Sequence, residues 1–445
     1  MTQPAHTSLI RGIRRWDLVA VAINGIIGAG IFGLPSKVFA LIGPYSLIAF
    51  IVCALVVTLI VLCFAEVSSR FSETGGPYLY AREAFGSVVG FEVGWLVWLA
   101  RLTAFAANCN LLVEYGGYFL PGIASGWPRA AVIIVIVAAL TVVNVIGVRD
   151  AALFSDVFSI GKLIPITLFI IAGLFFLNPQ NFTASAPPPV SDFSQSVLLL
   201  VYAFTGFEMA MIPAGEVRDP QRNLPFAALT SLGIVATVYI LIQVVCIGTL
   251  PELAASKRPL ADASQHFLGT VGASVITAGA IVSIIGNLSV LILAAARLPF
   301  AMAANRELPQ VFAATHSRFR TPHVAIIATG AVMLALTWSG TFIYALTIST
   351  IARLLSYIAT SLGLIVLRRR DRVGTEHPAQ FKAPFGAAVS IAALILILWL
   401  LANSTGREAR DAALATITGL AIYAAYKLIK PKTEVEEAAS STRAS

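Results

Sequence analysis

The sequence predicts an all-α integral membrane protein that crosses the bilayer many times, and three observations support this fold class. First, 58% of the 445 residues are hydrophobic and 12% are charged, whereas soluble domains carry about 25% charged residues. Second, apolar runs of about 20 residues, the length of a helix that crosses hydrocarbon, recur along the whole chain. Third, Lys and Arg residues gather in alternate connections, which is typical of membrane proteins.

Twelve apolar runs qualify as membrane spans, and short connections join them. The predicted spans are residues 17–40, 45–70, 88–119, 129–147, 155–177, 194–215, 226–248, 271–304, 323–338, 341–367, 385–402 and 411–429. The connection 72–86 mixes aromatic and charged residues, so we expect a short helix at the inner face. The N-terminal segment 1–16 is polar and basic, and segment 430–445 has the composition of a disordered tail.

The net charge of +8 is spread over the connections and does not form one patch. With the N-terminus inside, the inner segments hold most of the Lys and Arg residues, including Arg368, Arg369, Arg370 and Arg372. This is the positive-inside distribution, so we expect both termini in the cytoplasm and a location in the plasma (inner) membrane. The basic residues therefore set the orientation of the chain in the membrane and do not form a nucleic-acid-binding patch. The expected partner is the lipid bilayer.

A glycine-rich segment interrupts the first span. Residues 23–36 read INGIIGAGIFGLPS, with Gly25, Gly28, Gly30 and Gly33 followed by Pro35. Glycine weakens a helix interior and proline breaks it, so we expect the first helix to be broken at mid-membrane. Close packing of two helices is the alternative use of such small residues.

The sixth span repeats this arrangement. Gly206 precedes Pro213 by seven residues, as Gly28 precedes Pro35. Four spans separate the two segments, so a five-span unit would repeat, and because five is odd the second copy would be inverted. Paired interrupted segments of this kind point to a transporter's binding site. The predicted organisation is a first repeat over 17–177, a second repeat over 194–367 and two additional helices over 385–429.

A broken helix in hydrocarbon exposes backbone N–H and C=O groups that need polar partners. The half-helix that begins near Gly30 presents N–H groups and the positive end of its dipole, which suit a carboxylate. The half-helix that ends at Gly28 presents carbonyls, and so does the second break over 202–206; carbonyls suit an ammonium group. An α-amino acid carries both charges.

Four motifs, in this order, resemble those of the amino acid–polyamine–organocation permeases. The motifs are GIIGAGIFGLP, GGPYLYAREAFG, YAFTGFEMAMIPAGEVRDPQRNLP and AAARLPFAMAANRELPQVF. The resemblance covers nearly the whole chain and implies a LeuT-type fold of two inverted five-helix repeats plus two helices. It implies that the N–H groups of Ala29 and Gly30 bind the substrate carboxylate. It also implies that the carbonyls of Ile26, Tyr202 and Thr205 bind the ammonium group.

Lys162 lies about eight residues into the fifth span. A charge at the bilayer centre costs at least about 2.5–3.5 kcal/mol, so ionisable residues there are functional candidates. In the family that the chain resembles, a fifth-helix lysine at this place substitutes in some members for a cation between helices 1 and 8. The resemblance therefore implies that protonation of Lys162 couples proton entry to substrate movement. The alternative is a side chain that extends to the inner surface.

Three further ionisable residues lie within spans. Glu208 directly follows the second break, where it either accepts hydrogen bonds from freed amides or titrates during transport. Arg101 and Arg353 either pair with Glu114, Glu208 or free carbonyls and hold helices together, or one of them faces the cavity and binds an anionic side chain.

Amides and aromatic rings complete the set of candidates. Asn24, Asn108 and Asn287 either line the pathway or join helices. Phe204 and Phe207, beside the second break, either gate the site or pack between helices. Glu208 is the only acidic residue in the sequence around this break, so we expect a neutral substrate.

These patterns predict a secondary active amino acid permease that works by alternating access and takes up neutral amino acids with protons. An exchanger or polyamine carrier of the same fold is one alternative, and a nontransporting sensor or channel is another. The sequence has no GxxxxGK[ST] loop for ATP, no His/Cys cluster with metal-ligand spacing and no nucleophile–base pair. We therefore expect no cofactor, no metal and no catalytic residue.

Overall fold

The computed structural model describes residues 13–71, 76–146, 151–183, 186–211, 214, 217–319, 321–371 and 378–429, without the side chains of 151–160. These residues form fourteen α-helices with short 3-10 turns between them. In this part of the chain, the extended backbone of Ile13 pairs with that of Val217 in an isolated parallel bridge. The tail expected over 430–445 and most of the segment 1–16 lie outside the described residues.

Each of the twelve predicted spans contains at least one helix, and α4 is the short helix expected over 72–86. The helices are α1 (Arg15–Ile26), α2 (Gly30–Ile42), α3 (Ser46–Ser68), α4 (Pro77–Phe85), α5 (Ser87–Gly116), α6 (Gly126–Ile146), α7 (Ala151–Gly173), α8 (Val190–Phe204), α9 (Pro220–Thr249), α10 (Pro259–Ala304), α11 (His323–Ser339), α12 (Phe342–Asp371), α13 (Ala387–Ala402) and α14 (Gly406–Ile429).

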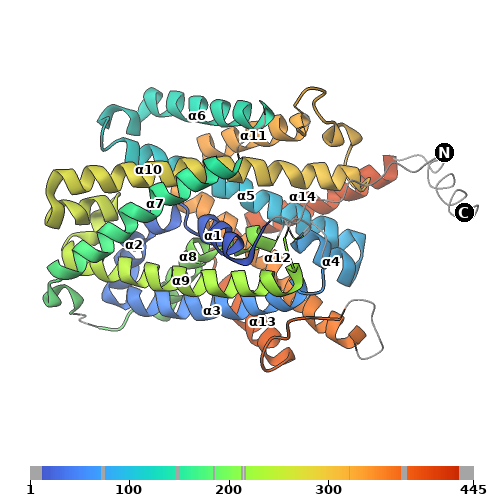
Figure 1. Ribbon diagram of the computed structural model, residues 1–445, viewed down its shortest axis with the longest axis horizontal. Coiled ribbons are helices and arrows are strands. Elements are labelled where there is room, and N and C mark those ends of the chain that lie inside the picture. The colour runs from blue at the N-terminus through green and yellow to red at the C-terminus, as the bar shows by residue number, and fades with distance from the viewer. Residues whose placement is uncertain are drawn as a thin grey trace, which may run out of the picture.

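The long helices run along one common direction. In Figure 1, α3, α5, α9 and α10 extend along the longest axis, with α6 and α11 at one edge and α13 at the opposite edge. By length and composition, seven helical segments among the described residues can cross a membrane, or eight if the bent pair α13–α14 is one span. The two breaks divide helices into shorter pieces, and α11 has only 17 residues. Such helices are too short to count as spans by length, so the number of twelve spans stays a prediction.

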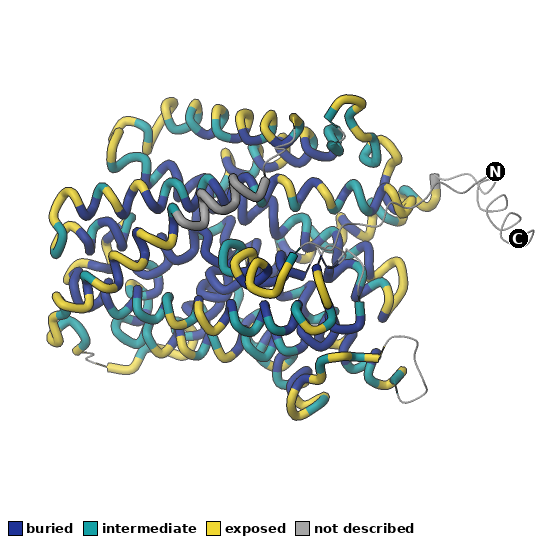
Figure 2. The backbone as a smooth tube through the Cα atoms, viewed as in Figure 1, coloured by how far each residue is buried: buried dark blue, intermediate teal, exposed yellow. Residues whose placement is uncertain are grey.

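The outer surface of the helix bundle is apolar. Figure 2 shows buried backbone at the centre and exposed backbone on the outer helices. Large aliphatic side chains on those helices are more than half exposed, namely Val135, Ile171, Ile395, Leu398 and Ile417. In water so many exposed large apolar side chains would be unfavourable, whereas hydrocarbon solvates them. The protein is therefore a multi-pass membrane protein.

The two broken helices lie at the centre of the bundle, where α1 and α8 appear in Figure 1. Leu18, Val19 and Ala22 of α1 form a buried apolar cluster with Ala210 and Ala214, which follow the break in the other helix. On the far side of the breaks, α2 packs against α8. The halves of the two helices therefore pair with each other, and both breaks fall at the same level.

Helix α10 begins earlier than the predicted eighth span, at Pro259 rather than residue 271. Proline is favoured in the first turn of a helix, and the chain continues from Pro259 without a loop. Gly269 has φ +64°, a non-helical angle that divides this helix. The part of α10 after Gly269 corresponds to the predicted span.

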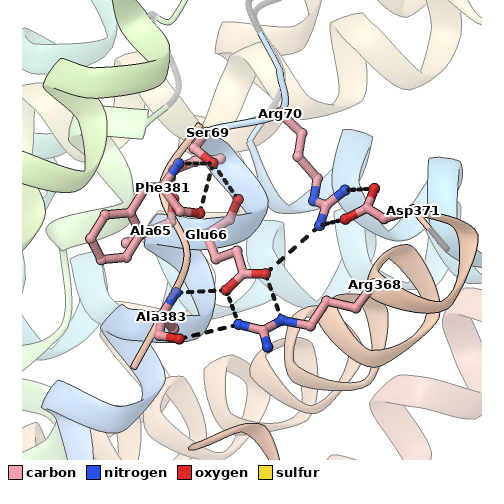
Figure 3. Close-up of polar contacts among 9 residues, drawn as sticks. Ala65, Glu66, Ser69, Arg70, Arg368, Asp371, Phe381 and Ala383 are labelled. Atoms are coloured by element: carbon pink, nitrogen blue, oxygen red, sulfur yellow. Dashed lines mark hydrogen bonds and ion pairs between the residues drawn. The ribbon is translucent and has the colours of Figure 1, made fainter. Parts of the chain in front are cut away.

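Charged side chains join the C-terminal end of α3 to that of α12 (Figure 3). Glu66 is 1% exposed and accepts hydrogen bonds from Nε of Arg368 at 2.6 Å and from the N–H of Ala383 at 2.7 Å. Arg70 donates both Nη groups to the carboxylate of Asp371 at 2.7 Å. We call Glu66, Arg70, Arg368 and Asp371 the α3–α12 network. It holds two helix ends and the connection before α13 together.

Candidate functional site

The first break separates α1 from α2 at residues 27–29. The N–H of Gly28 bonds to the carbonyl of Ile26 at 2.9 Å, and the N–H of Phe32 bonds to that of Ala29 at 3.0 Å. Within the described residues, no acceptor is bonded to the N–H groups of Ala29 and Gly30. These two donors stand at the N-terminus of α2, where the helix dipole favours an anion. The local sequence produces this break because the glycines weaken the helix, whereas Pro35 lies inside α2, which continues to Ile42.

The second break follows Phe204, where α8 ends and a short 3-10 turn, η5 (Phe207–Met211), begins. Gly206 has φ +113°, a conformation that side-chain-bearing residues avoid. A Cβ on Gly206 would lie 2.3 Å from the carbonyl oxygen of Gly25. The two breaks therefore touch, and glycine is required at the contact.

A pocket lies between the two breaks on one side and α5 and α10 on the other. Its unfilled space is about 340 Å³, including the part open to solvent. The lining residues are Gly25, Ile26, Gly28, Ala29, Gly30, Ala104, Asn108, Tyr202, Thr205, Gly206, Met209, Asn287, Leu291 and Arg353. All seven residues that the sequence assigned to substrate binding are among them. The tertiary structure brings them together from α1, α2, α8 and their breaks.

The three carbonyls expected to bind an ammonium group differ in this conformation. The carbonyl of Ile26 accepts from the Tyr239 hydroxyl at 3.1 Å and from the N–H of Gly28. The carbonyl of Tyr202 accepts from Oγ1 and N–H of Thr205, at 2.7 and 3.3 Å. No donor among the described residues bonds to the carbonyl of Thr205. An incoming ammonium group would therefore meet one free carbonyl and two that already hold protein donors.

Tyr239 of α9 connects the two breaks and was not among the sequence candidates. Its hydroxyl lies 3.1 Å from the carbonyl oxygen of Ile26 and 3.1 Å from that of Ala203. The side chain is fully buried. A tyrosine within an apolar run carries no local signal of such a role, because only the packing of α9 against α1 and α8 places it there.

Lys162 of α7 points at the first break. Its Nζ donates hydrogen bonds to the carbonyls of Asn24 and Ile27, both at 3.0 Å, and the residue is 1% exposed. The side chain does not extend to the surface, which was the alternative. It places a cationic group against the carbonyls at the C-terminal end of α1, where the helix dipole favours positive charge. Asn24 takes part through its backbone and does not line the pocket.

Glu208 and Arg353 form a buried ion pair beside the second break. Oε2 of Glu208 also accepts from the N–H of Gly206 at 3.0 Å and from the Tyr357 hydroxyl at 3.2 Å. Glu208 therefore binds a freed amide and braces the break. Arg353 pairs with Glu208, which is the first alternative, and it also lines the pocket; binding of an anionic side chain stays a prediction.

Arg101 lies outside the pocket lining. Its Nη1 donates to the carbonyl of Ala294 in α10 at 2.8 Å, and its Nε and Nη2 have no partner in the described part of the chain. Of the roles expected for Arg101, the structure shows a bond to a backbone carbonyl. This bond joins α5 to α10.

The aromatic candidates pack in the core. Phe204 is buried against Phe50 and Tyr239, and Phe207 against Phe64 and Tyr357. Neither lines the pocket. This placement is that of the packing alternative, and a gating role stays a prediction.

Two asparagines face each other across the pocket wall. Nδ2 of Asn108 donates to Oδ1 of Asn287 at 2.6 Å, and the Tyr202 hydroxyl donates to Oδ1 of Asn108 at 2.8 Å. The chain of bonds joins α10, α5 and α8. These amides line the pocket and also join helices.

The fold and the site define a class: a helical membrane protein with a polar pocket between two interrupted helices, which is a carrier. No group of three or more His, Cys, Asp or Glu side chains within the described residues could hold a metal. The chain belongs to the amino acid permease family, whose model matches residues 13–423. It is a membrane transporter of this family and not an enzyme.

Three bacterial relatives from Bacillus subtilis (strain 168) match nearly the full length. The chain is 28% identical to a methylthioribose transporter, over 95% of each chain. It is 26% identical to the branched-chain amino acid permease BcaP, over 94% of this chain and 93% of the relative. It is 27% identical to the serine/threonine exchanger SteT, over 93% of this chain and 95% of the relative.

Proposed function

We propose that the protein is a secondary active transporter that moves L-amino acids across the membrane by alternating access, with proton-coupled uptake of neutral amino acids. The observation that carries this proposal is the contact of two broken helices at one pocket. The free N–H groups of Ala29 and Gly30 would bind the substrate carboxylate. The free carbonyl of Thr205, with those of Ile26 and Tyr202, would bind the ammonium group.

The bound substrate would hold the two breaks together. Its carboxylate belongs to the α2 side and its ammonium group to the α8 side, so both helices gain partners for backbone groups that are otherwise unpaired. Movement of the half-helices α1 and η5 relative to α2 and α8 would then open the pocket to alternate faces of the membrane. The inverted repeat over 17–177 and 194–367 supplies the two related halves.

Lys162 would couple this movement to protons. Its protonated Nζ makes charge-assisted hydrogen bonds to the carbonyls of Asn24 and Ile27, and such bonds are about twice as strong as neutral ones. Loss of the proton weakens the hold of α7 on the end of α1. Glu208 remains a second candidate because it bonds directly to the second break.

The arrangement in the membrane follows from the charge distribution. We propose twelve spans in the plasma (inner) membrane with both termini in the cytoplasm, energised by a proton gradient and not by ATP.

Amino acid exchange is the second candidate function. It is favoured by the match to the serine/threonine exchanger, which covers more than nine-tenths of both chains. Uptake of a neutral thioether sugar is a third, favoured by the equally extensive match to the methylthioribose transporter. Exchange would use the same pocket and the same two breaks. Methylthioribose has neither a carboxylate nor an ammonium group, so it would need other contacts in this pocket.

Transport by purified protein in proteoliposomes tests these candidates. We expect uptake of radiolabelled neutral amino acids that an inward proton gradient stimulates several-fold. Counterflow that ignores the gradient would instead establish exchange. Absence of both uptake and counterflow across the twenty amino acids would overturn the amino acid assignment, and uptake of methylthioribose alone would replace it.

A further inference from the structure

The pocket wall opposite the breaks consists of four side chains from two helices. Ala104 and Asn108 come from α5, and Asn287 and Leu291 from α10. In each pair the residues are four apart, so they share one helix face. This wall is the surface that a substrate side chain would meet once its carboxylate and ammonium groups occupy the two breaks.

The wall offers hydrogen-bond donors to the pocket. An asparagine side chain has two N–H donors and one carbonyl acceptor. Oδ1 of Asn287 is used by Asn108, and Oδ1 of Asn108 is used by Tyr202. Nδ2 of Asn287 has no bonded acceptor within the described residues, although Asn287 is 7% exposed. Each Oδ1 of the amide pair therefore already accepts one hydrogen bond, while Nδ2 of Asn287 is an unpaired donor.

Asn287 lies close to the first break. A Cβ on Gly28 would be 3.3 Å from Cγ and Nδ2 of Asn287. The free donor is thus beside the N–H groups of Ala29 and Gly30, and the first atoms of a substrate side chain would reach it. Leu291, Ala104 and Met209 supply the apolar remainder of the pocket.

The charges around the pocket disfavour a cationic side chain. Among the described residues, Arg353 is the one charged residue in the lining, and the carboxylate of Glu208 is already bonded to Arg353, Tyr357 and the N–H of Gly206. A second ammonium group, as in lysine or a polyamine, would find no unpaired carboxylate among the described lining residues. Because Glu208 also neutralises Arg353, the described part of the pocket offers no unmatched positive charge to a carboxylate side chain.

We propose that the pocket selects neutral amino acids whose side chain carries an oxygen acceptor, a hydroxyl or a carboxamide, and that Nδ2 of Asn287 binds that oxygen. This inference rests on the proposed amino acid transport. A purely aliphatic substrate side chain would cover this N–H donor without bonding to it. The free energy lost by leaving the donor unpaired would disfavour aliphatic substrates.

Competition in proteoliposomes with isosteric pairs tests the inference. Threonine and valine have the same shape and differ in one hydroxyl, as asparagine and leucine differ in the carboxamide. We expect threonine to compete about tenfold better than valine, the effect of one unpaired buried donor, and asparagine to compete better than leucine, aspartate and lysine. Asn287→Leu should abolish the preference for threonine over valine.

Asn144→Leu is the matched control, because Asn144 is buried in α6 and bonds only to the carbonyl of Leu140 in the described structure. It should keep the threonine preference. The ratios of competition measured with the wild-type protein test the inference even if a variant does not fold. A valine or lysine preference, or aspartate above asparagine, overturns this inference while transport itself stands. Transport of no amino acid overturns the proposed function as well.

Discussion

At the scale of single residues, the breaks depend on glycines that no other residue replaces. Gly206 combines φ +113° with a Cβ position 2.3 Å from a backbone oxygen of Gly25. Backbone cannot rotate away from such a contact without moving one of the broken helices. The two breaks can therefore stay in contact at the pocket only if residue 206 has no side chain.

Gly206→Ala should abolish transport and destabilise the protein. Gly233→Ala should leave transport unchanged, because a Cβ on Gly233 of α9 meets no atom within 4 Å and alanine favours a helix by about 1 kcal/mol. Uptake in proteoliposomes and thermal unfolding in detergent measure both effects. Equal behaviour of the two variants would show that the contact with Gly25 is unimportant.

Lys162→Met should remove the response of uptake to a proton gradient while leaving substrate counterflow detectable. Its Nζ is the only cationic group bonded to the carbonyls of Asn24 and Ile27 in the described part of the chain, and methionine cannot carry a proton. Lys257→Met, at an exposed residue of a connection, is the control. The coupling assignment fails if the methionine variant at 162 keeps the wild-type dependence of uptake on pH.

The sequence predicts some of these residues and not others, for physical reasons. Lys162 and Gly28 are recognisable because charges and helix breakers are costly in hydrocarbon and rarely occur there without a role. Tyr239 is not recognisable, because a buried tyrosine is common in a membrane helix. Its function is decided by which carbonyls lie within reach of its hydroxyl.

At the scale of elements, buried charged side chains join the C-terminal ends of α3 and α12. In the α3–α12 network, Glu66 is almost fully buried and receives donors from Arg368 and Ala383, while Arg70 binds Asp371. In the sequence these arginines are indistinguishable from others that set topology. The structure shows that some of them pair with buried acids.

Glu66→Gln should lower the free energy of unfolding by about 2 kcal/mol, because an amide cannot accept all the charge-assisted hydrogen bonds that the buried Glu66 carboxylate receives from Arg368 and from the N–H of Ala383. Glu83→Gln is the control: its pair with Arg370 has side chains 46% and 56% exposed, and exposed pairs contribute less than about 1 kcal/mol. Unfolding of both variants in detergent micelles measures the difference. Similar losses would mean that the buried network does not join α3 to α12 in the membrane protein.

At the scale of the whole molecule, the apolar exterior and the alternation of positive charge are the basis of the proposed membrane orientation. In that proposal the segment before α10 lies outside the cell and the segment after it lies inside. The four native cysteines are buried, so an added cysteine reports its own location.

Lys257→Cys should react with a membrane-impermeant maleimide in intact cells, because Lys257 is exposed in the predicted outer segment. Ser317→Cys, exposed in the segment between α10 and α11, should react only after the membrane is opened. Labelling of residue 317 in intact cells, with protection of residue 257, would invert the proposed topology.

The sequence alone determined that the chain is a helical membrane protein and where its first and sixth helices break. These properties are local, since hydropathy and helix propensity act over one span. Only the tertiary structure decided that the breaks touch, that Lys162 turns inward to one of them, and that Asn108 and Asn287 share a wall. Those relations join residues more than a hundred positions apart, and packing among helices sets them.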